Sequence, residues 1–240
     1  TSDFILTNLF WYGIMYGAWR LVQHLTPLHL DKANPLVWLL AFGLSDLSYY
    51  LYHRTSHRMR LLWAVHAVHH TSHNYNLSTA LRLSSLEGLI RWPFWLILPA
   101  IGVPAPLTMT AYLFVRVYQV PLHTTYVGRL GFFERLFLTT PSIHRVHHGR
   151  NPQYIDKNYG GVTTIWDHLF GTYEPEVEIV DYGTVPPLNS DNPLIITFGE
   201  FVSLGRDIAA TPRLLDKLRY PFMPPGWRPK TLAAPISAAA

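Results

Sequence analysis

Histidine is concentrated in three short stretches of this sequence. They read HRTSH at 53–57, HAVHH at 66–70 and HRVHH at 144–148. Positions i, i+3 and i+4 of a helix share one face, so each stretch would aim two or three imidazoles in one direction. Imidazole binds Fe, Cu, Ni and Zn, and the chain has no cysteine that could add thiolate ligands. The pattern therefore indicates a metal site.

The number of clustered histidines favours two metal ions over one. The three stretches hold eight histidines, which is more than one ion can bind. Without metal, so many imidazoles packed together would be half satisfied and would repel one another when protonated. These eight are the predicted ligands from the three stretches: His53, His57, His66, His69, His70, His144, His147 and His148.

The elements around the histidines have the composition of a membrane protein. Apolar residues make up 49% of the chain and charged residues 14%, against the roughly 25% charged that is usual. An apolar helix of about 20 residues crosses a ~30 Å hydrocarbon layer. We expect an all-α integral membrane protein with four membrane segments in two hairpins, at residues 4–25, 35–52, 88–103 and 107–122. Pro93 and Pro99 are expected to kink the third segment.

The polar stretches between and after these segments are expected to form a helical cap within a single domain, 1–240. The cap would comprise 53–87 and 123–176, followed by a C-terminal surface region, 177–240. In that region we expect a helix from about 193 to 220 that is capped by Asn192 and broken near Pro212. Two hairpins return the chain to the same side, so the histidines share one face. Arginines flank that face and only Lys32 lies in the first outer turn, which favours the cytoplasmic side.

The distribution of charged residues along the chain indicates which kinds of binding partner are expected. The net charge is +4, but the basic residues are scattered along the chain and form no stripe on one helix. This distribution argues against a nucleic-acid partner and favours anionic lipid headgroups. The chain begins at Thr1 without a basic region followed by a cleavage site, so no signal peptide is expected.

Three longer stretches resemble one known family. HRTSH, HAVHHTSHNYNLSTALR and HRVHHGRNPQYIDKNYGGVTTIWDHLFGTYEPE are similar to the fatty acid hydroxylase and sterol desaturase superfamily, over about residues 40–176. Within it the likeness is greatest to the alkylglycerol monooxygenases and their bacterial relatives. The chain departs from that branch in having Arg58 where an acid usually follows the first stretch, and His73 where glutamate is common.

The resemblance adds candidate site residues. It implies that the eight histidines are metal ligands and that His123, in LHTTYVG, is a ninth. Asn158 and Tyr159 match family positions and are expected to contact ligands. Position adds Asp46, which lies seven residues before His53, two turns along the same helix face. Its carboxylate is expected to bond a ligand histidine and fix its tautomer. The alternative is an acid at the helix end that pairs with an arginine. Asp46, Asn158 and Tyr159 are therefore the predicted catalytic residues.

The family likeness implies a non-haem di-iron centre that uses O2 to hydroxylate a C–H bond of a lipid: a fatty acyl chain, a sterol or an alkyl ether. The chain contains no dinucleotide-binding G-x-G-x-x-G and no cytochrome b5 haem signature. Electrons would then come from outside, from a tetrahydropterin, a ferredoxin or a cytochrome b5.

Other functions stay open from the sequence. A desaturase or sterol oxidase would use the same centre, because hydroxylation and desaturation share the hydrogen-abstraction step. A zinc hydrolase or metal-binding scaffold is disfavoured, since H-E-x-x-H is absent. A metal transporter would place histidines inside the membrane segments, whereas these follow them.

Overall fold

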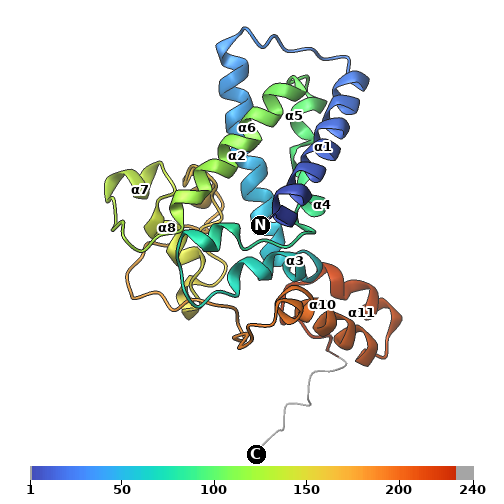
Figure 1. Ribbon diagram of the computed structural model, residues 1–240, viewed down its shortest axis with the longest axis vertical. Helices are drawn as coiled ribbons and strands as arrows, with labels where there is room; N and C mark the ends of the chain where they lie inside the picture. Colours follow the sequence, from blue (N-terminus) through green and yellow to red (C-terminus); the bar gives the residue numbers. More distant parts are fainter. Residues whose placement is uncertain (1, 231–240) are drawn as a thin grey trace, which may run out of the picture.

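The computed structural model describes residues 2–230, with side chains from residue 7 onward. Within that range every regular element is a helix, as the sequence predicts. The β-type pairing found there is confined to two isolated bridges, Leu138 with Thr163 and Gly149 with Tyr182. Figure 1 shows an elongated helical bundle above a cap of short helices and long connections.

The bundle contains the two longest helices within residues 2–230, α1 (Ser2–Leu25) and α2 (Pro35–Arg58). It also contains α5 (Ile97–Ala100) and α6 (Ala105–Gln119). At the start of α2 the Asn34 side chain accepts a hydrogen bond from the Leu36 N–H at 2.9 Å, and Pro35 takes the first helical position. The core combines aromatic rings with small side chains, among them Trp19, Trp95, Tyr112, Ala41, Ala105 and Ala111.

The apolar stretch 88–103 is not a continuous helix. It is divided into α4 (Glu87–Arg91), η2 (Trp92–Trp95) and α5. Pro93 and Pro99 lack the N–H that an uninterrupted helix needs, which explains the breaks that the sequence led us to expect. The stretch turns at Gly102, whose φ is 92° and where a Cβ would lie 2.6 Å from the Leu28 carbonyl oxygen. Only glycine fits that turn.

The expected membrane segments 35–52 and 107–122 correspond to α2 and to α6 with η3 (Val120–Leu122). α2 continues past residue 52 to Arg58, so the first histidine stretch lies on the same helix as the apolar segment. Over residues 2–230, no single helix combines the length and the hydropathy that crossing a membrane requires. The four membrane segments therefore stay a prediction.

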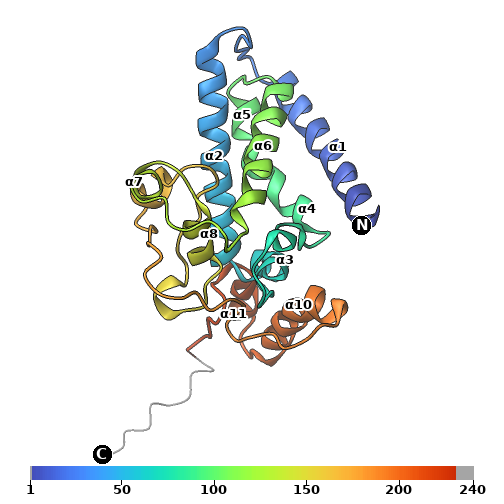
Figure 2. The same ribbon diagram turned by 60° about the vertical axis from the view of Figure 1, so that its left-hand side comes forward.

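The cap places the other histidine stretches beside the lower end of α2. α3 (Arg60–His70) follows α2 after Met59 alone, and α8 (Pro141–His147) packs against η3 (Figure 2). The cap also contains η1 (Leu77–Leu81), α7 (Phe132–Leu136), η4 (Pro152–Tyr154) and α9 (Ile165–Leu169).

A buried arginine fixes α8 within the cap. The Arg145 guanidinium donates to both carboxylate oxygens of Glu176, at 2.8 and 2.6 Å. It also donates to the carbonyl oxygens of Thr124 and Val127, at 3.0 and 2.7 Å. Such bidentate, charge-assisted pairs are among the strongest hydrogen bonds in proteins. The histidines of α8 are thereby held between the chain segments on either side of them.

The predicted C-terminal helix is two helices. α10 (Pro193–Ala210) is capped by the Asn192 side chain, which accepts from the Leu194 N–H at 2.9 Å, and it ends at Thr211 before Pro212. α11 (Leu214–Arg219) and η5 (Tyr220–Phe222) follow. The break near Pro212 and the Asn192 cap are confirmed. α10 packs on α3, where the Arg60 guanidinium lies 3.3 Å from Asp207.

Candidate metal centre

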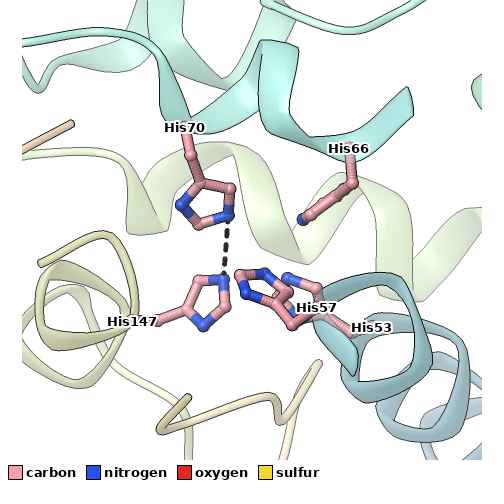
Figure 3. A group of neighbouring side chains, drawn as sticks. All are labelled: His53, His57, His66, His70 and His147. Carbon is pink, nitrogen blue, oxygen red and sulfur yellow. Dashed lines mark hydrogen bonds between the residues drawn. The ribbon is translucent and has the colours of Figure 1, made fainter. Parts of the chain in front are cut away.

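The histidines from distant parts of the chain converge in two adjoining groups. One group contains five: His53, His57, His66, His70 and His147; the other contains four: His69, His123, His144 and His148. Within each group the candidate ligand nitrogens lie within 4.8 Å of one another. Eight of the nine residues are buried, and His57 is partly buried with its Nε2 atom buried. Figure 3 shows the five rings of the first group converging from α2, α3 and α8. These nine are the predicted ligands; that they bind metal stays a prediction.

The histidines of each H-x-x-H-H stretch are divided between the two groups. On α3, positions 66 and 70 belong to the first group and position 69 to the second. On α8 the division is reversed, with position 147 in the first group, and 144 and the capping residue 148 in the second. The His70 and His148 rings stack across the boundary with centroids 4.3 Å apart. One helix face therefore serves two neighbouring sites.

The ring nitrogens of both groups suit a cation. The Nε2 atoms of His53, His57 and His66 are buried and have no hydrogen-bond partner among the described residues. The Nε2 atoms of His70 and His147 face each other at 3.2 Å. A buried acceptor without a partner costs free energy, which a metal ion bound to the lone pairs would recover. The donor set fits two ions of the first-row type that imidazole prefers.

Burial keeps these imidazoles in the form that binds metal. It lowers the pKa of His123 and of His147 to about 4. Burial, with the neighbouring imidazoles adding to its effect, also holds the pKa of His53, His66 and His70 well below the ordinary value. The rings are neutral near pH 7, so each keeps one nitrogen lone pair for coordination.

Backbone carbonyls fix the tautomers. His53 Nδ1 lies 3.1 Å from the Tyr159 carbonyl oxygen, and His147 Nδ1 lies 2.9 Å from that of Lys157. A carbonyl only accepts, so each Nδ1 carries the proton and each Nε2 is free for a metal. Two further rings of the second group are held in the same way: His69 by Arg82 at 3.3 Å and His123 by Gln119 at 2.9 Å.

The segment that supplies two of these carbonyls has an unusual backbone. Asp156 and Asn158 have φ values of 61° and 55°, in the left-handed region that residues other than glycine seldom adopt. The Asn158 side chain donates to the Ile143 and Glu174 carbonyl oxygens, at 3.1 and 2.7 Å. Asn158 thus braces the segment and bonds no histidine, contrary to the expectation that it contacts a ligand.

Tyr159 meets that expectation in part. Its carbonyl holds His53, and its ring centroid lies 5.3 Å from that of His57. Its hydroxyl donates to Asp156 at 3.0 Å. Its N–H donates to Asp167 at 2.8 Å; burial raises the pKa of this carboxyl to about 6. Tyr159 is a positioning residue in this geometry, and a catalytic role stays a prediction.

The expectation that Asp46 bonds a ligand histidine is wrong. Its carboxylate accepts from the N–H groups of Val162 and Thr163, at 2.7 and 3.2 Å. It also accepts from the Thr163 hydroxyl at 2.6 Å and from the Trp166 indole at 3.0 Å. Asp46 faces a loop that returns from more than a hundred residues away. It ties α2 to the segment just after Tyr159.

The carboxylate that does contact a histidine is Glu87, which we did not predict. Its Oε1 lies 3.4 Å from His66 Nδ1 and also accepts from the Tyr52 hydroxyl. Burial raises the pKa of this carboxyl. The sequence feature that could have indicated Glu87 is its position as an acid at the boundary between the polar stretch 53–87 and the apolar stretch 88–103. His73 and His168 lie outside both groups and face backbone carbonyls, of Tyr182 and Arg135 respectively.

Two separate cavities reach the histidines. One, of about 200 Å³, lies between the ends of α2 and α6 and is lined by His66, His69 and His123 together with tyrosine and leucine side chains. The other, of about 420 Å³, opens on His57, His70 and His147 and is bordered by the turn Pro224–Gly226. The first is lined by residues of both the helical bundle and the cap, and the second mainly by the cap.

Comparisons with known proteins agree with this site. The fatty acid hydroxylase family model matches residues 38–172, which include all nine clustered histidines. Alkylglycerol monooxygenase from Homo sapiens is 43% identical over 84% of this chain and 45% of its own length. The Xenopus tropicalis protein is 41% identical over 91% of this chain and 47% of its own.

A more distant relative is the ornithine lipid hydroxylase OlsE of Rhizobium tropici, 27% identical over 62% of this chain and 46% of its own length. The chain thus spans about half the length of the relatives it matches. No solved structure matches significantly.

Proposed function

Since the chain belongs to the fatty acid hydroxylase family, we propose that it is the catalytic part of a membrane-bound, non-haem di-iron oxygenase that hydroxylates a C–H bond of a lipid. The observation that carries the proposal is the pair of adjoining histidine groups, five and four, buried beside a cavity that leads from the helical bundle.

The irons, when bound, would supply the activation of O2. The reaction converts a C–H bond to C–OH, and the second oxygen atom leaves as water. It consumes two electrons from an external donor, which is a tetrahydropterin, a ferredoxin or a cytochrome b5, and two protons that come from solvent. The protein would hold each ion with neutral imidazoles whose tautomers are fixed by carbonyls such as that of Tyr159. Burial would exclude bulk water from the reacting carbon.

The helical bundle is the proposed membrane part. Its outer faces carry exposed apolar side chains, for example Phe10 of α1 (61% exposed), Leu39 of α2 (72%) and Val117 of α6 (68%). An exposed apolar band of this kind is typical of a lipid-facing surface. A lipid would then enter the 200 Å³ cavity from the bundle, and the histidines would lie on the cytoplasmic side. The 420 Å³ cavity on the cap side is the proposed approach for the electron donor.

Product analysis under ¹⁸O2 tests this function. Purified protein is loaded with ferrous iron without air, then given reductant, ¹⁸O2 and a panel of fatty acids, sterols and alkyl ethers. A product that carries one ¹⁸O atom supports hydroxylation. A product that lacks two hydrogens and carries no ¹⁸O identifies a desaturase. No product from iron-loaded protein contradicts both. His147→Ala is the inactive control.

A further inference from the structure

A second group of buried polar atoms lies beside the histidines, in the space between α1, α2, α4 and α6. Arg91 is 1% exposed, and its Nε and Nη1 have no hydrogen-bond partner among the described residues. Glu87 Oε2 and the Tyr112 hydroxyl are likewise buried without a partner, as is the Nε of Arg116. Glu87 pairs with His66 and lies beyond salt-bridge distance of Arg91, so its carboxylate attracts the Arg91 charge only from farther away. The Arg91 guanidinium lies 5.9 Å from the ring of Tyr52 and from that of Tyr112.

Burying these polar atoms costs folding free energy unless a ligand supplies their missing hydrogen-bond partners. A buried guanidinium without a hydrogen-bonded anion loses its hydration and gains little in return. The two aromatic faces offset only part of that loss. The unpaired atoms are mostly donors, from Arg91, Arg116 and Tyr112, against one acceptor on Glu87. The missing partner is therefore rich in acceptor oxygens.

The group lies where two cavities meet. A cavity of about 180 Å³ is lined by Trp11, Ser84, Arg91 and Glu87. The 200 Å³ cavity is lined by Glu87 and Arg116 together with His66, His69 and His123. Leu83 and Glu87 border both. A ligand that bonds Arg91 and Arg116 would therefore lie next to His66, which Glu87 also contacts.

We propose that Arg91, Glu87 and Arg116 bind the oxygen-bearing headgroup of the lipid substrate. The assignment rests on the proposed function, because it takes the lipid as given and names the residues that select it. It has a consequence for the reaction. Glu87 would contact both the headgroup and His66, so the headgroup would lie close to the histidines. The first carbons of the lipid chain, rather than its far end, would then lie at the histidines. Oxidation is then expected close to the headgroup.

Lipid binding without turnover tests the proposal. The probes are three tritiated C16 lipids: hexadecanoate, 1-O-hexadecylglycerol and the headless hydrocarbon hexadecane. Their dissociation constants are measured by scintillation proximity on purified protein without reductant or O2. Hydrogen bonds to a charged group contribute about 1.5–3 kcal/mol each, so removing one is expected to weaken binding roughly 10- to 100-fold. Arg91→Gln and Arg116→Gln should each show this for a headed probe and leave hexadecane unchanged.

The controls separate headgroup recognition from a structural role. Arg20→Gln, at an exposed position on α1 outside both cavities, should bind every probe as the wild type does. If Arg91→Gln fails to fold, Arg116→Gln decides. Equal losses for headed and headless probes, or no loss for either headed probe, would overturn the proposal. Because binding is measured without turnover, a protein that binds headed lipids but oxygenates none would count against the proposed function alone.

Discussion

Asp46 provides a sharp test of how the metal centre is supported. Asp46→Ala would leave four partly buried donors of Val162, Thr163 and Trp166 without an acceptor. Hydrogen bonds to a charged acceptor contribute about 1.5–3 kcal/mol each, but bonds that share one carboxylate are not additive. We therefore expect a loss of unfolding free energy on the order of 3–5 kcal/mol, a large part of the ~5–15 kcal/mol typical of a protein. Asp46→Asn keeps one acceptor oxygen and should fall between.

The same substitution should weaken metal binding from a distance. The loop that Asp46 holds begins just after Tyr159, whose carbonyl fixes the tautomer of His53. Loss of such outer contacts typically lowers metal affinity 10- to 100-fold. Unfolding free energy is measured by chemical denaturation of the metal-free protein in detergent, and metal affinity by competition with a chelator.

A double-mutant cycle isolates the hydrogen bond between the Asp46 carboxylate and the Thr163 hydroxyl. Asp46→Ala and Thr163→Val should be coupled by roughly 1–2 kcal/mol, since the two side chains bond directly. Asp31→Ala is the matched control, because this exposed carboxylate accepts from only one backbone group, the Ala33 N–H at 2.8 Å. Additive effects, or an Asp46→Ala protein as stable as the wild type, would refute this reasoning.

Three further predictions follow from the site. Glu87→Leu should weaken metal binding about 10- to 100-fold in chelator competition, because His66 loses its carboxylate partner; an unchanged affinity contradicts that role. The metal-free protein should lose stability as the pH falls from about 6.5 towards 4. In the folded protein His123 and His147 each have a pKa of about 4 and stay neutral over this range, whereas in the unfolded chain both histidines bind protons. Each should contribute up to about 1.4 kcal/mol per pH unit in urea unfolding, and a flat profile would contradict their burial as neutral rings. Arg145→Lys should cost about 2–3 kcal/mol of unfolding free energy through the lost bidentate pair, whereas Arg150→Lys, whose partner Asp181 is exposed, should cost less than about 1; equal losses would be inconsistent with the buried clamp.

The sequence predicts the composition of the histidine site well because its signal is local. The i, i+3, i+4 spacing places several rings on one helix face, and α3 and α8 follow that rule. The division into groups of five and four is not local. It depends on where α2, α3 and α8 lie relative to one another, which no spacing within one helix specifies.

The supporting contacts are harder to predict for a different reason. The groups that hold His53 and His147 are backbone carbonyls, which every residue possesses, so the side chains of Tyr159 and Lys157 give no indication of the role. Asp46 and Glu87 are both acids near a histidine stretch. Only the packing of α4 against α3 and the return of the loop after Tyr159 decide which of them contacts a ring.

Local sequence patterns also predict only part of the fold. The helical class follows from the composition and the apolar runs, and Pro212 and Asn192 mark a real break and a real cap. The stretch 88–103 is expected to form one kinked segment because it is predominantly apolar, with Arg91 as its one charged residue. Pro93 and Pro99 divide it into short helices that bring Glu87 and Arg91 beside the histidines, a consequence that hydropathy does not reveal.

The central claim is that two adjoining histidine groups each hold an iron ion. Mössbauer spectroscopy with metal analysis on protein produced in iron-57 tests it most directly. We expect about two coupled irons per chain in the wild type, fewer in His147→Ala and in His144→Ala, one variant for each group, and two in the exposed control His24→Ala. Zinc or no metal in the wild type after anaerobic reconstitution with ferrous iron, or an unchanged iron content in both variants, would contradict the account.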